Sequence, residues 1–228
     1  MVSQKQKIMK IFLVIPSFNE DKRLTETIKK AKQFIAPEKI VVIDDGSKVP
    51  EHLPKNTGVW LLRHKLNLGK GAAMRTGAEF AFDHGADAVI FMDADCQHDP
   101  KEIPVFTKYL EEGYQMVFGS RRPGINIPLT RLLGKKFSSI YVNFVFGIYI
   151  SDILSGYRAL TKKAYDLVKW ESDRYAVETE MVALMSHHKK DLNWIEFPIE
   201  TIYMDKYKGM TPIDAIRLLL SSIRWKLR

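Results

Sequence analysis

Apolar and polar positions fall into blocks along the first half of the chain. Three short apolar runs span residues 8–15, 40–43 and 88–92, and each stops at polar residues. Runs of this kind predict buried strands. Elsewhere, apolar positions recur at helical spacing, which predicts helices at 24–34, 70–84, 103–112, 129–146, 177–188 and 213–226. This alternation indicates an α/β fold with a mostly parallel central sheet flanked by helices.

The length and composition of the chain fit one domain. Its 228 residues, 46% of them hydrophobic, can bury one substantial core, and no linker, internal repeat or low-complexity run divides them. We therefore expect one main domain over residues 1–211, followed by a basic amphipathic helix over 212–228. The single cysteine, Cys96, excludes an internal disulfide and fits a reducing cytoplasm.

Neither a secretion signal nor a membrane span is expected. Residues 1–10 are basic and polar, and the apolar run that follows lacks a cleavage site with small residues. The longest uncharged stretch, residues 137–150, is shorter than the roughly 20 residues needed to cross a bilayer. We expect a cytoplasmic protein that could bind peripherally to the cytoplasmic face of the membrane.

Two carboxylates directly follow the third apolar run. Asp93 and Asp95 are separated by one residue, and Gln97 follows them. Ligands of open α/β sheets gather where strands end, and oxygen ligands without a Cys or His cluster suit Mg²⁺ or Mn²⁺. Such ions usually accompany a phosphate-bearing substrate, so the expected partner is a nucleotide diphosphate. An isolated Asp-x-Asp is more often a solvated loop, so this interpretation depends on the neighbouring loops.

Polar loops also follow the other two apolar runs. Residues 16–20 follow the first run and residues 44–47 follow the second. If the three strands are parallel, all three loops lie at one edge of the sheet and can converge on one ligand. The alternative for the first loop is a helix cap, in which Asn19 would satisfy backbone donors at the start of the next helix. The two interpretations are compatible.

Six short motifs follow one another over nearly the whole chain. They are residues 15–20, 41–47, 67–73, 93–98, 119–121 and 152–158. Together they resemble glycosyltransferase family 2, and within it the polyprenyl-phosphate sugar synthases typified by dolichol-phosphate mannose synthase. The resemblance implies a GT-A fold, a nucleotide-sugar donor, a divalent cation and inversion at the anomeric carbon.

The resemblance assigns residues to the nucleoside by their positions in these motifs. Pro16, Phe18 and Glu20 would border the nucleoside, although the family usually has Tyr where Phe18 stands. Asp45 would accept a hydrogen bond from the base, and its neighbour Asp44 would cap the turn.

The same resemblance implies a metal cluster and its catalytic helpers. Asp93, Asp95 and Gln97 would hold Mg²⁺ or Mn²⁺, with Asp93 also near the ribose and Asp95 bridging to the diphosphate. Departure of a nucleoside diphosphate concentrates negative charge on its β-phosphate, so cationic groups must be in place before the bond breaks. Arg121 and Arg131 are expected to help, because a planar guanidinium can bind phosphate oxygens in two places.

Two lysines and one aspartate complete the candidate site. Lys70 lies between two glycines and is a donor-binding candidate, although the spacing of a Walker phosphate loop is not met. Lys206 stands where the family has a mobile loop with an arginine and a Ser-Lys pair, which are missing here. Asp152 is the candidate general base if the acceptor is a hydroxyl that must lose a proton. Glu178 and Glu180 open a predicted helix, where glutamates often only complement the helix dipole.

These assignments predict an inverting enzyme that moves a hexose from GDP-mannose or UDP-glucose to a polyprenyl or dolichyl phosphate. The alternative keeps the same donor site and uses a saccharide hydroxyl as the acceptor. A sugar-phosphate nucleotidyltransferase would begin with a glycine-rich, arginine-containing loop that this chain lacks. A non-enzymatic scaffold would be expected to have a degraded metal motif, whereas this motif is intact.

The net charge of +8 raises the question of an anionic partner. The basic residues do not interleave with aromatics in a recognisable module, so we expect no nucleic-acid partner. The helix at 212–228 could lie on an anionic membrane, gaining about 1 kcal/mol for each basic residue near the surface, and Trp225 suits such an interface. Alternatively, this helix packs against the domain. Residues 137–150 would form a core helix or, as the resemblance implies, face a lipid-phosphate acceptor.

Overall fold

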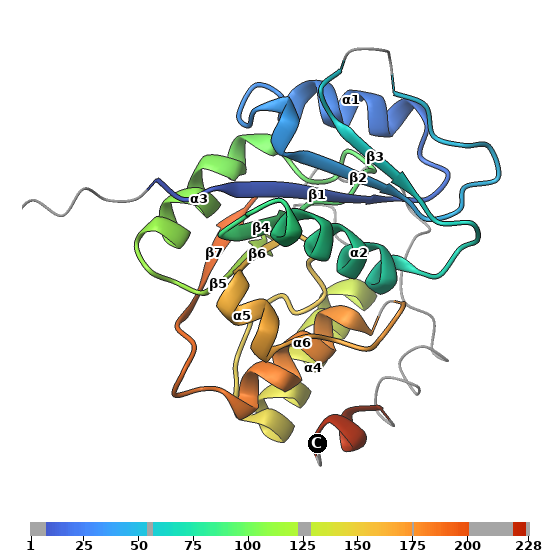
Figure 1. Ribbon diagram of the computed structural model, residues 1–228. Coiled ribbons are helices and arrows are strands. Elements are labelled where there is room, and N and C mark those ends of the chain that lie inside the picture. The colour runs from blue at the N-terminus through green and yellow to red at the C-terminus, as the bar shows by residue number, and fades with distance from the viewer. Residues whose placement is uncertain (1–7, 54–56, 123–128, 175, 201–220, 227–228) are drawn as a thin grey trace, which may run out of the picture.

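A computed structural model describes residues 8–53, 57–122, 129–174, 176–200 and 221–226 of the chain (Figure 1). One seven-stranded sheet, in the order β3-β2-β1-β4-β6-β5-β7, forms its centre. The strands are β1 (Ile11–Ser17), β2 (Ile40–Asp44), β3 (Trp60–Arg63), β4 (Ala88–Phe91), β5 (Met116–Arg121), β6 (Arg158–Thr161) and β7 (Trp194–Ile199). The α-helices are α1 (Lys22–Ala31), α2 (Lys70–Asp83), α3 (Ile103–Glu111), α4 (Leu129–Phe146), α5 (Lys162–Leu167) and α6 (Val177–His187).

All strands except β6 run in one direction. Strand β1 pairs in parallel with β2 and β4, β2 with β3, and β5 with β7, whereas β6 is antiparallel to both β4 and β5. The prediction of a mostly parallel sheet is confirmed, as are the three predicted strands. Because the parallel strands share a direction, the loops that leave β1, β2, β4 and β5 reach the same edge of the sheet.

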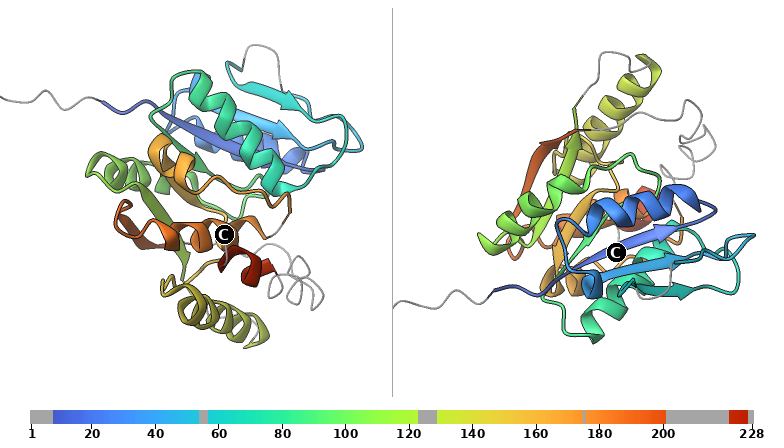
Figure 2. Two further views of the ribbon diagram at one scale, coloured as in Figure 1. Left: turned by 60° about the horizontal axis from the view of Figure 1, so that its bottom comes forward. Right: turned by 90° about the horizontal axis from the view of Figure 1, so that it is seen from above.

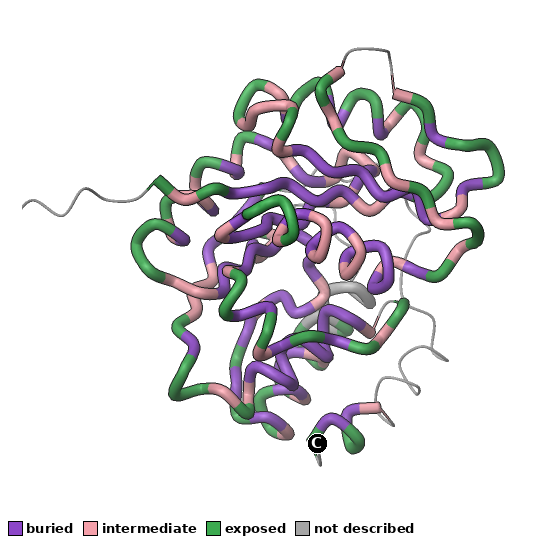
Figure 3. Tube along the Cα trace, viewed as in Figure 1, coloured by how far each residue is buried: buried purple, intermediate pink, exposed green. Residues whose placement is uncertain are grey.

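Helices cover both faces of the sheet, as Figures 1 and 2 show. Successive side chains of β1 point to opposite faces, so Leu13 packs in a core with α1 and α3, while Val14 packs in a core with α2, α4, α5 and α6. Figure 3 shows the central strands largely in purple, the colour of buried residues. This burial on both faces explains why the strands appear in the sequence as apolar runs rather than as alternating patterns.

Five of the predicted helices are confirmed, four of them with at least one shifted end and α4 with both ends as predicted, and α5 was not predicted. Helix α5 is six residues long, too short to give a clear periodic pattern, and the Thr161 side chain caps it by accepting from the Ala164 N–H. Of the expected C-terminal helix, residues 221–226 are helical and the rest lies outside the described residues. Trp225 is 4% exposed and belongs to the core, while Ile223 is 59% exposed. The described part of this helix therefore packs against the domain.

Two helical glycines test how tightly α2 lies on the sheet. A Cβ at Gly77 in α2 would overlap the side chain of Val14 in β1, whereas a Cβ at Gly134 in α4 meets nothing within 4 Å. We expect Gly77→Ala to lower the free energy of unfolding by about 1–3 kcal/mol, because a buried β-branched neighbour cannot move aside cheaply. Gly134→Ala should raise it by about 0.5–1 kcal/mol through better helix propensity. Urea unfolding measures both, and equal effects of the two substitutions would contradict the tight packing of α2.

Candidate active site

The expected convergence of the strand-end loops is confirmed. In the sheet register Ser17 pairs with Asp44, and Val14 pairs with Phe91, so β1, β2 and β4 end near one another. The loops at 18–21, 45–47 and 92–98 therefore begin along one edge. Arg121 ends β5, which runs in the same direction, so it lies at the same edge of the sheet.

Asp44 caps its turn as expected. Its carboxylate accepts from the backbone N–H groups of Ser47 at 2.8 Å and Glu51 at 3.1 Å, and from the Arg63 guanidinium at 3.0 Å. Burial alone would raise the pKa of the Asp44 carboxyl. The hydrogen bonds from Ser47 and Glu51 and the charge of Arg63 outweigh burial and lower that pKa.

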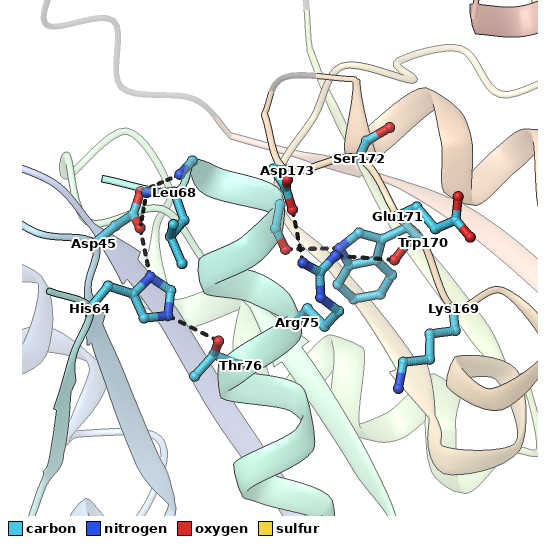
Figure 4. Close-up of polar contacts among 12 residues, drawn as sticks. Asp45, His64, Leu68, Arg75, Thr76, Lys169, Trp170, Glu171, Ser172 and Asp173 are labelled. Atoms are coloured by element: carbon cyan, nitrogen blue, oxygen red, sulfur yellow. Dashed lines mark hydrogen bonds and ion pairs between the residues drawn. The ribbon is translucent and has the colours of Figure 1, made fainter. Parts of the chain in front are cut away.

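Asp45 is engaged by the protein's own groups. Its carboxylate accepts from the N–H groups of Leu68 at 3.0 Å and Gly69 at 2.7 Å, and lies 2.7 Å from His64 Nδ1 (Figure 4). His64 Nε2 in turn lies 3.0 Å from the Thr76 hydroxyl on α2. Asp45 is 3% exposed. This arrangement ties β2 to the start of α2, and the predicted contact with a nucleotide base stays a prediction.

A glutamate that the sequence did not single out organises the first loop. Glu51 is buried, and its carboxylate accepts from the Ser17 hydroxyl at 3.0 Å and from the N–H groups of Glu20 at 2.9 Å and Asp21 at 3.0 Å. The Asn19 side chain accepts from the Lys48 N–H at 2.9 Å. The predicted cap by Asn19 is therefore wrong, because its side chain bonds the neighbouring loop instead of the first turn of α1.

The residues predicted to border the nucleoside stand around this loop. Pro16 lies within β1 and is partly exposed, and Phe18 is 41% exposed, so its ring is available for stacking. Glu20 forms a 2.6 Å ion pair with Arg23. These positions are compatible with the predicted roles and do not test them.

Asp93 is the most strongly paired residue of the acidic motif. Its Oδ1 lies 2.7 Å from Lys70 Nζ, and its backbone N–H donates to His98 Nδ1 at 3.1 Å. Burial alone would raise the pKa of Asp93, but the charges of Lys70 and His98 and the hydrogen bond from Lys70 lower it to about 2. Burial lowers the pKa of His98 to about 4, so this imidazole is neutral near pH 7.

Asp95 has no comparable compensation. From the residues that the structure describes, its carboxylate accepts one hydrogen bond, from the Gln97 N–H at 3.1 Å, and burial together with the nearby charge of Asp93 raises its pKa. A raised carboxylate pKa marks a place where positive charge is favoured. Within the described ranges no three His, Cys, Asp or Glu side chains cluster as metal ligands. Two carboxylates and one amide fit Mg²⁺ or Mn²⁺, which usually complete their shells with water and substrate phosphates.

The glycines on either side of Lys70 serve a close backbone contact. A Cβ on Gly71 would overlap the carbonyl of Ser172, and the Gly71 N–H donates to the Asp173 carbonyl at 2.7 Å. Arg75 on α2 also bonds the Asp173 carboxylate at 2.8 Å, as Figure 4 shows. The start of α2 is thus occupied by residues 172–173, which agrees with the absence of Walker spacing in the sequence.

Arg121 and Asp152 form a two-pronged ion pair. Arg121 donates from Nε to Asp152 Oδ2 at 2.7 Å and from Nη2 to Oδ1 at 2.9 Å. Asp152 is buried, and this geometry suits a carboxylate that fixes a guanidinium. The backbone of Arg131 lies in α4, but its side chain is not described, and Lys206 lies outside the described residues. The roles predicted for Arg131 and Lys206 stay predictions.

The sequence analysis assigned no part in the site to two residues beside the acidic motif, Glu178 and Arg158. Glu178 is buried with its Oε1 3.0 Å from Lys70 Nζ, and Arg158 is 1% exposed with its guanidinium bonded to backbone carbonyls. Arg158 lies in the motif at 152–158, whereas Glu178 lies in none of the six motifs. Glu178 lies far along the chain from Lys70, so their contact could not be read from spacing.

Asp45→Asn tests whether that carboxylate serves the fold. The substitution leaves the N–H groups of Leu68 and Gly69 with a neutral acceptor, and one Asp45 oxygen becomes a donor that faces donors. We expect the free energy of unfolding to fall by about 1–3 kcal/mol in urea titrations. Asp191→Asn, at an exposed turn, is the control and should change it by less than about 0.5 kcal/mol. An unchanged stability of Asp45→Asn would argue against the structural role.

Comparison with known proteins agrees with this architecture. The solved glucosyl-3-phosphoglycerate synthase of Mycobacterium tuberculosis, in complex with Mn²⁺, UDP and glucosyl-3-phosphoglycerate, matches with a TM-score of 0.68. The match covers 94% of this chain and 80% of that chain at 19% identity, so it shows a shared GT-A fold.

Relatives in sequence are more similar. The chain is 31% identical over 218 residues to the UDP-N-acetylglucosamine–dolichyl-phosphate N-acetylglucosaminyltransferase of Methanococcus voltae, covering 86% of each. It is 29% identical over 210 residues to the undecaprenyl-phosphate mannosyltransferase of Micrococcus luteus, covering 84% of this chain and 83% of that protein. Residues 12–168 match the sequence profile described as Glycosyl transferase family 2. The chain belongs to glycosyltransferase family 2.

Proposed function

We propose that this protein transfers a sugar from a nucleotide-diphosphate donor to a polyprenyl phosphate, with a divalent cation and with inversion. The observation that carries the proposal is the acidic motif at the end of β4, where the charge of Lys70 and the hydrogen bond from Gln97 do not offset burial and the charge of Asp93, so the pKa of Asp95 is raised. The relatives named as polyprenyl-phosphate sugar transferases support the acceptor class. The neighbour in complex with Mn²⁺ and UDP supports the cation and the donor class.

The residues expected to bind the nucleotide sugar act on its diphosphate, which gains negative charge as it leaves. When bound at Asp93, Asp95 and Gln97, Mg²⁺ or Mn²⁺ would neutralise the departing diphosphate. Arg121 is oriented by Asp152, and its side chain is 29% exposed, so the guanidinium is held at the site edge before the donor arrives. GDP-mannose and UDP-glucose both remain candidate donors, since the relatives' names include different sugars.

The carboxylates near the site favour a phosphate acceptor over a saccharide hydroxyl. A hydroxyl must lose its proton as it attacks, whereas a lipid phosphate is already anionic near neutral pH. Asp152, the candidate base, pairs with Arg121, and two other carboxylates are engaged as well: Glu178 pairs with Lys70, and Glu180 accepts from the backbone of residues 171 and 172. The alternative acceptor would require one of these contacts to break.

An exposed apolar stripe on α4 suits contact with the membrane that carries such a lipid. Phe137, Ile140 and Phe144 lie on one side of the helix and are 64%, 64% and 88% exposed. The helix at 221–226 lies beside α4, since Ser222 bonds Tyr141, and it adds exposed apolar and basic residues. These residues are Ile223, Arg224 and Lys226. Aromatic and basic groups side by side match an anionic bilayer surface. No helix within the described ranges is long and apolar enough to cross a membrane.

An extraction assay tests the proposed reaction. Radiolabelled GDP-mannose and UDP-glucose are each incubated with the protein, a prenyl phosphate and Mn²⁺, and product is counted in the organic phase. We expect extractable product that disappears with EDTA, and Asp95→Asn should lower turnover by about 100-fold or more while the fold is retained. Asp99→Asn, where the side chain caps a short 3-10 helix, is the control and should keep most activity. Wild-type turnover by Asp95→Asn would refute the proposed role.

Vesicle binding tests the α4 stripe. Phe144→Glu places a charge at the most exposed position of the stripe, so we expect clearly weaker co-sedimentation with vesicles that contain anionic phospholipid. Phe34→Glu is the matched control, because Phe34 is also exposed, at 41%, but lies after α1, which covers the opposite face of the sheet. Equal binding of the two variants would contradict the proposed surface.

A further inference from the structure

We propose that Lys70 and Glu178 are a positioning pair that sets the negative charge that Asp93 presents to the cation. The inference rests on the proposed metal-dependent function and deepens it. Lys70 Nζ lies 2.7 Å from Asp93 Oδ1 and 3.0 Å from Glu178 Oε1. The ammonium group thus lies between two carboxylates, which defines its place more closely than a single partner would.

The three side chains come from separate parts of the fold. Lys70 begins α2, Asp93 follows β4, and Glu178 lies in the first turn of α6. Gly156, in the loop before β6, closes the space beside them, since a Cβ there would lie 2.5 Å from Lys70 Nζ and 2.7 Å from Asp93 Oδ2. Backbone therefore borders the contact on one side, while 28% of the Asp93 side chain stays exposed.

Arg158 holds the surroundings of this pair in place. Its guanidinium is fully enclosed and donates to the carbonyls of Glu178 at 3.1 Å, Ile153 at 2.8 Å and Ser155 at 2.6 Å. One side chain thus joins the start of α6 to the loop that carries Gly156. The position of Glu178 is consequently set by the protein before any cation binds.

The pair divides the two oxygens of Asp93. Oδ1 is held by Lys70, whereas Oδ2 lies 3.9 Å from the ring of His98, which leaves Oδ2 together with Asp95 for the cation. Two carboxylates and one ammonium give this group a net negative charge that attracts a divalent ion. Neutralising Glu178 would let Lys70 cancel the charge of Asp93. Removing the ammonium would instead increase the negative charge that the cation meets.

The two substitutions therefore have opposite expected effects on metal binding. Glu178→Gln should weaken Mn²⁺ binding by about 10-fold, the lower end of the usual effect of residues that orient metal ligands. Lys70→Met should strengthen it. Glu79→Gln is the matched control. Glu79 on α2 also pairs with a lysine, Lys169, at 2.7 Å, but Lys169 does not pair with Asp93. Mn²⁺ alone is titrated into each purified full-length variant, and free Mn²⁺ is measured by electron paramagnetic resonance.

Thermal unfolding accompanies each titration, so that loss of fold is separated from loss of affinity. If Lys70→Met does not fold, Lys70→Gln carries the same expectation, since it also lacks the ammonium charge. Opposite shifts with an unchanged control support the positioning pair. Unchanged affinity in Glu178→Gln, or weaker binding in both variants, overturns it. Asp95→Asn distinguishes failure of this inference from failure of the proposed function. If Asp95→Asn abolishes Mn²⁺ binding and Glu178→Gln leaves it unaltered, this inference alone is overturned. If the wild-type protein does not bind Mn²⁺, the metal-dependent function is overturned.

Discussion

Buried backbone N–H groups at the end of the sheet need acceptors, and carboxylates supply them. Asp44, Asp45, Glu51 and Glu180 each accept from at least two backbone N–H groups in the loops beside them. Leaving such groups unpaired in the interior is costly, so these contacts define the loop conformations. The loops that carry the candidate site are therefore fixed by the protein itself, which is what a preorganised site requires.

The hydrogen bonds that each carboxylate accepts from the protein distinguish structural carboxylates from candidate functional ones. Asp45 and Asp152 have both oxygens committed to protein donors, whereas the Asp95 carboxylate accepts one backbone hydrogen bond beside another carboxylate. Burial and that neighbour disfavour its charged form. A cation would therefore be stabilised most at the end of β4, where the proposed function needs one.

The sequence predicted the fold class and the meeting place of the loops because both follow from local patterns. Apolar runs predicted strands that are buried on both faces of the sheet, and the shared direction of these strands places the loop motifs at one edge. Roles within the motifs were harder to predict. Asp44 and Asp45 are adjacent and chemically identical, and their partners at Arg63 and His64 come from another strand and the loop after it. Contacts such as Lys70 with Glu178 join distant segments, and a single sequence contains no spacing rule for them.

The reversed direction of β6 determines which residue lies opposite Asp93. In the antiparallel register Phe91 pairs with Arg158, so the residue two beyond Phe91 comes opposite the residue two before Arg158. Those residues are Asp93 and Gly156. Removing the residue between Gly156 and β6 would bring a serine opposite the carboxylate, and adding one there would bring a tyrosine. The number of residues between Gly156 and β6 is consequently constrained as strictly as the identity of residue 156.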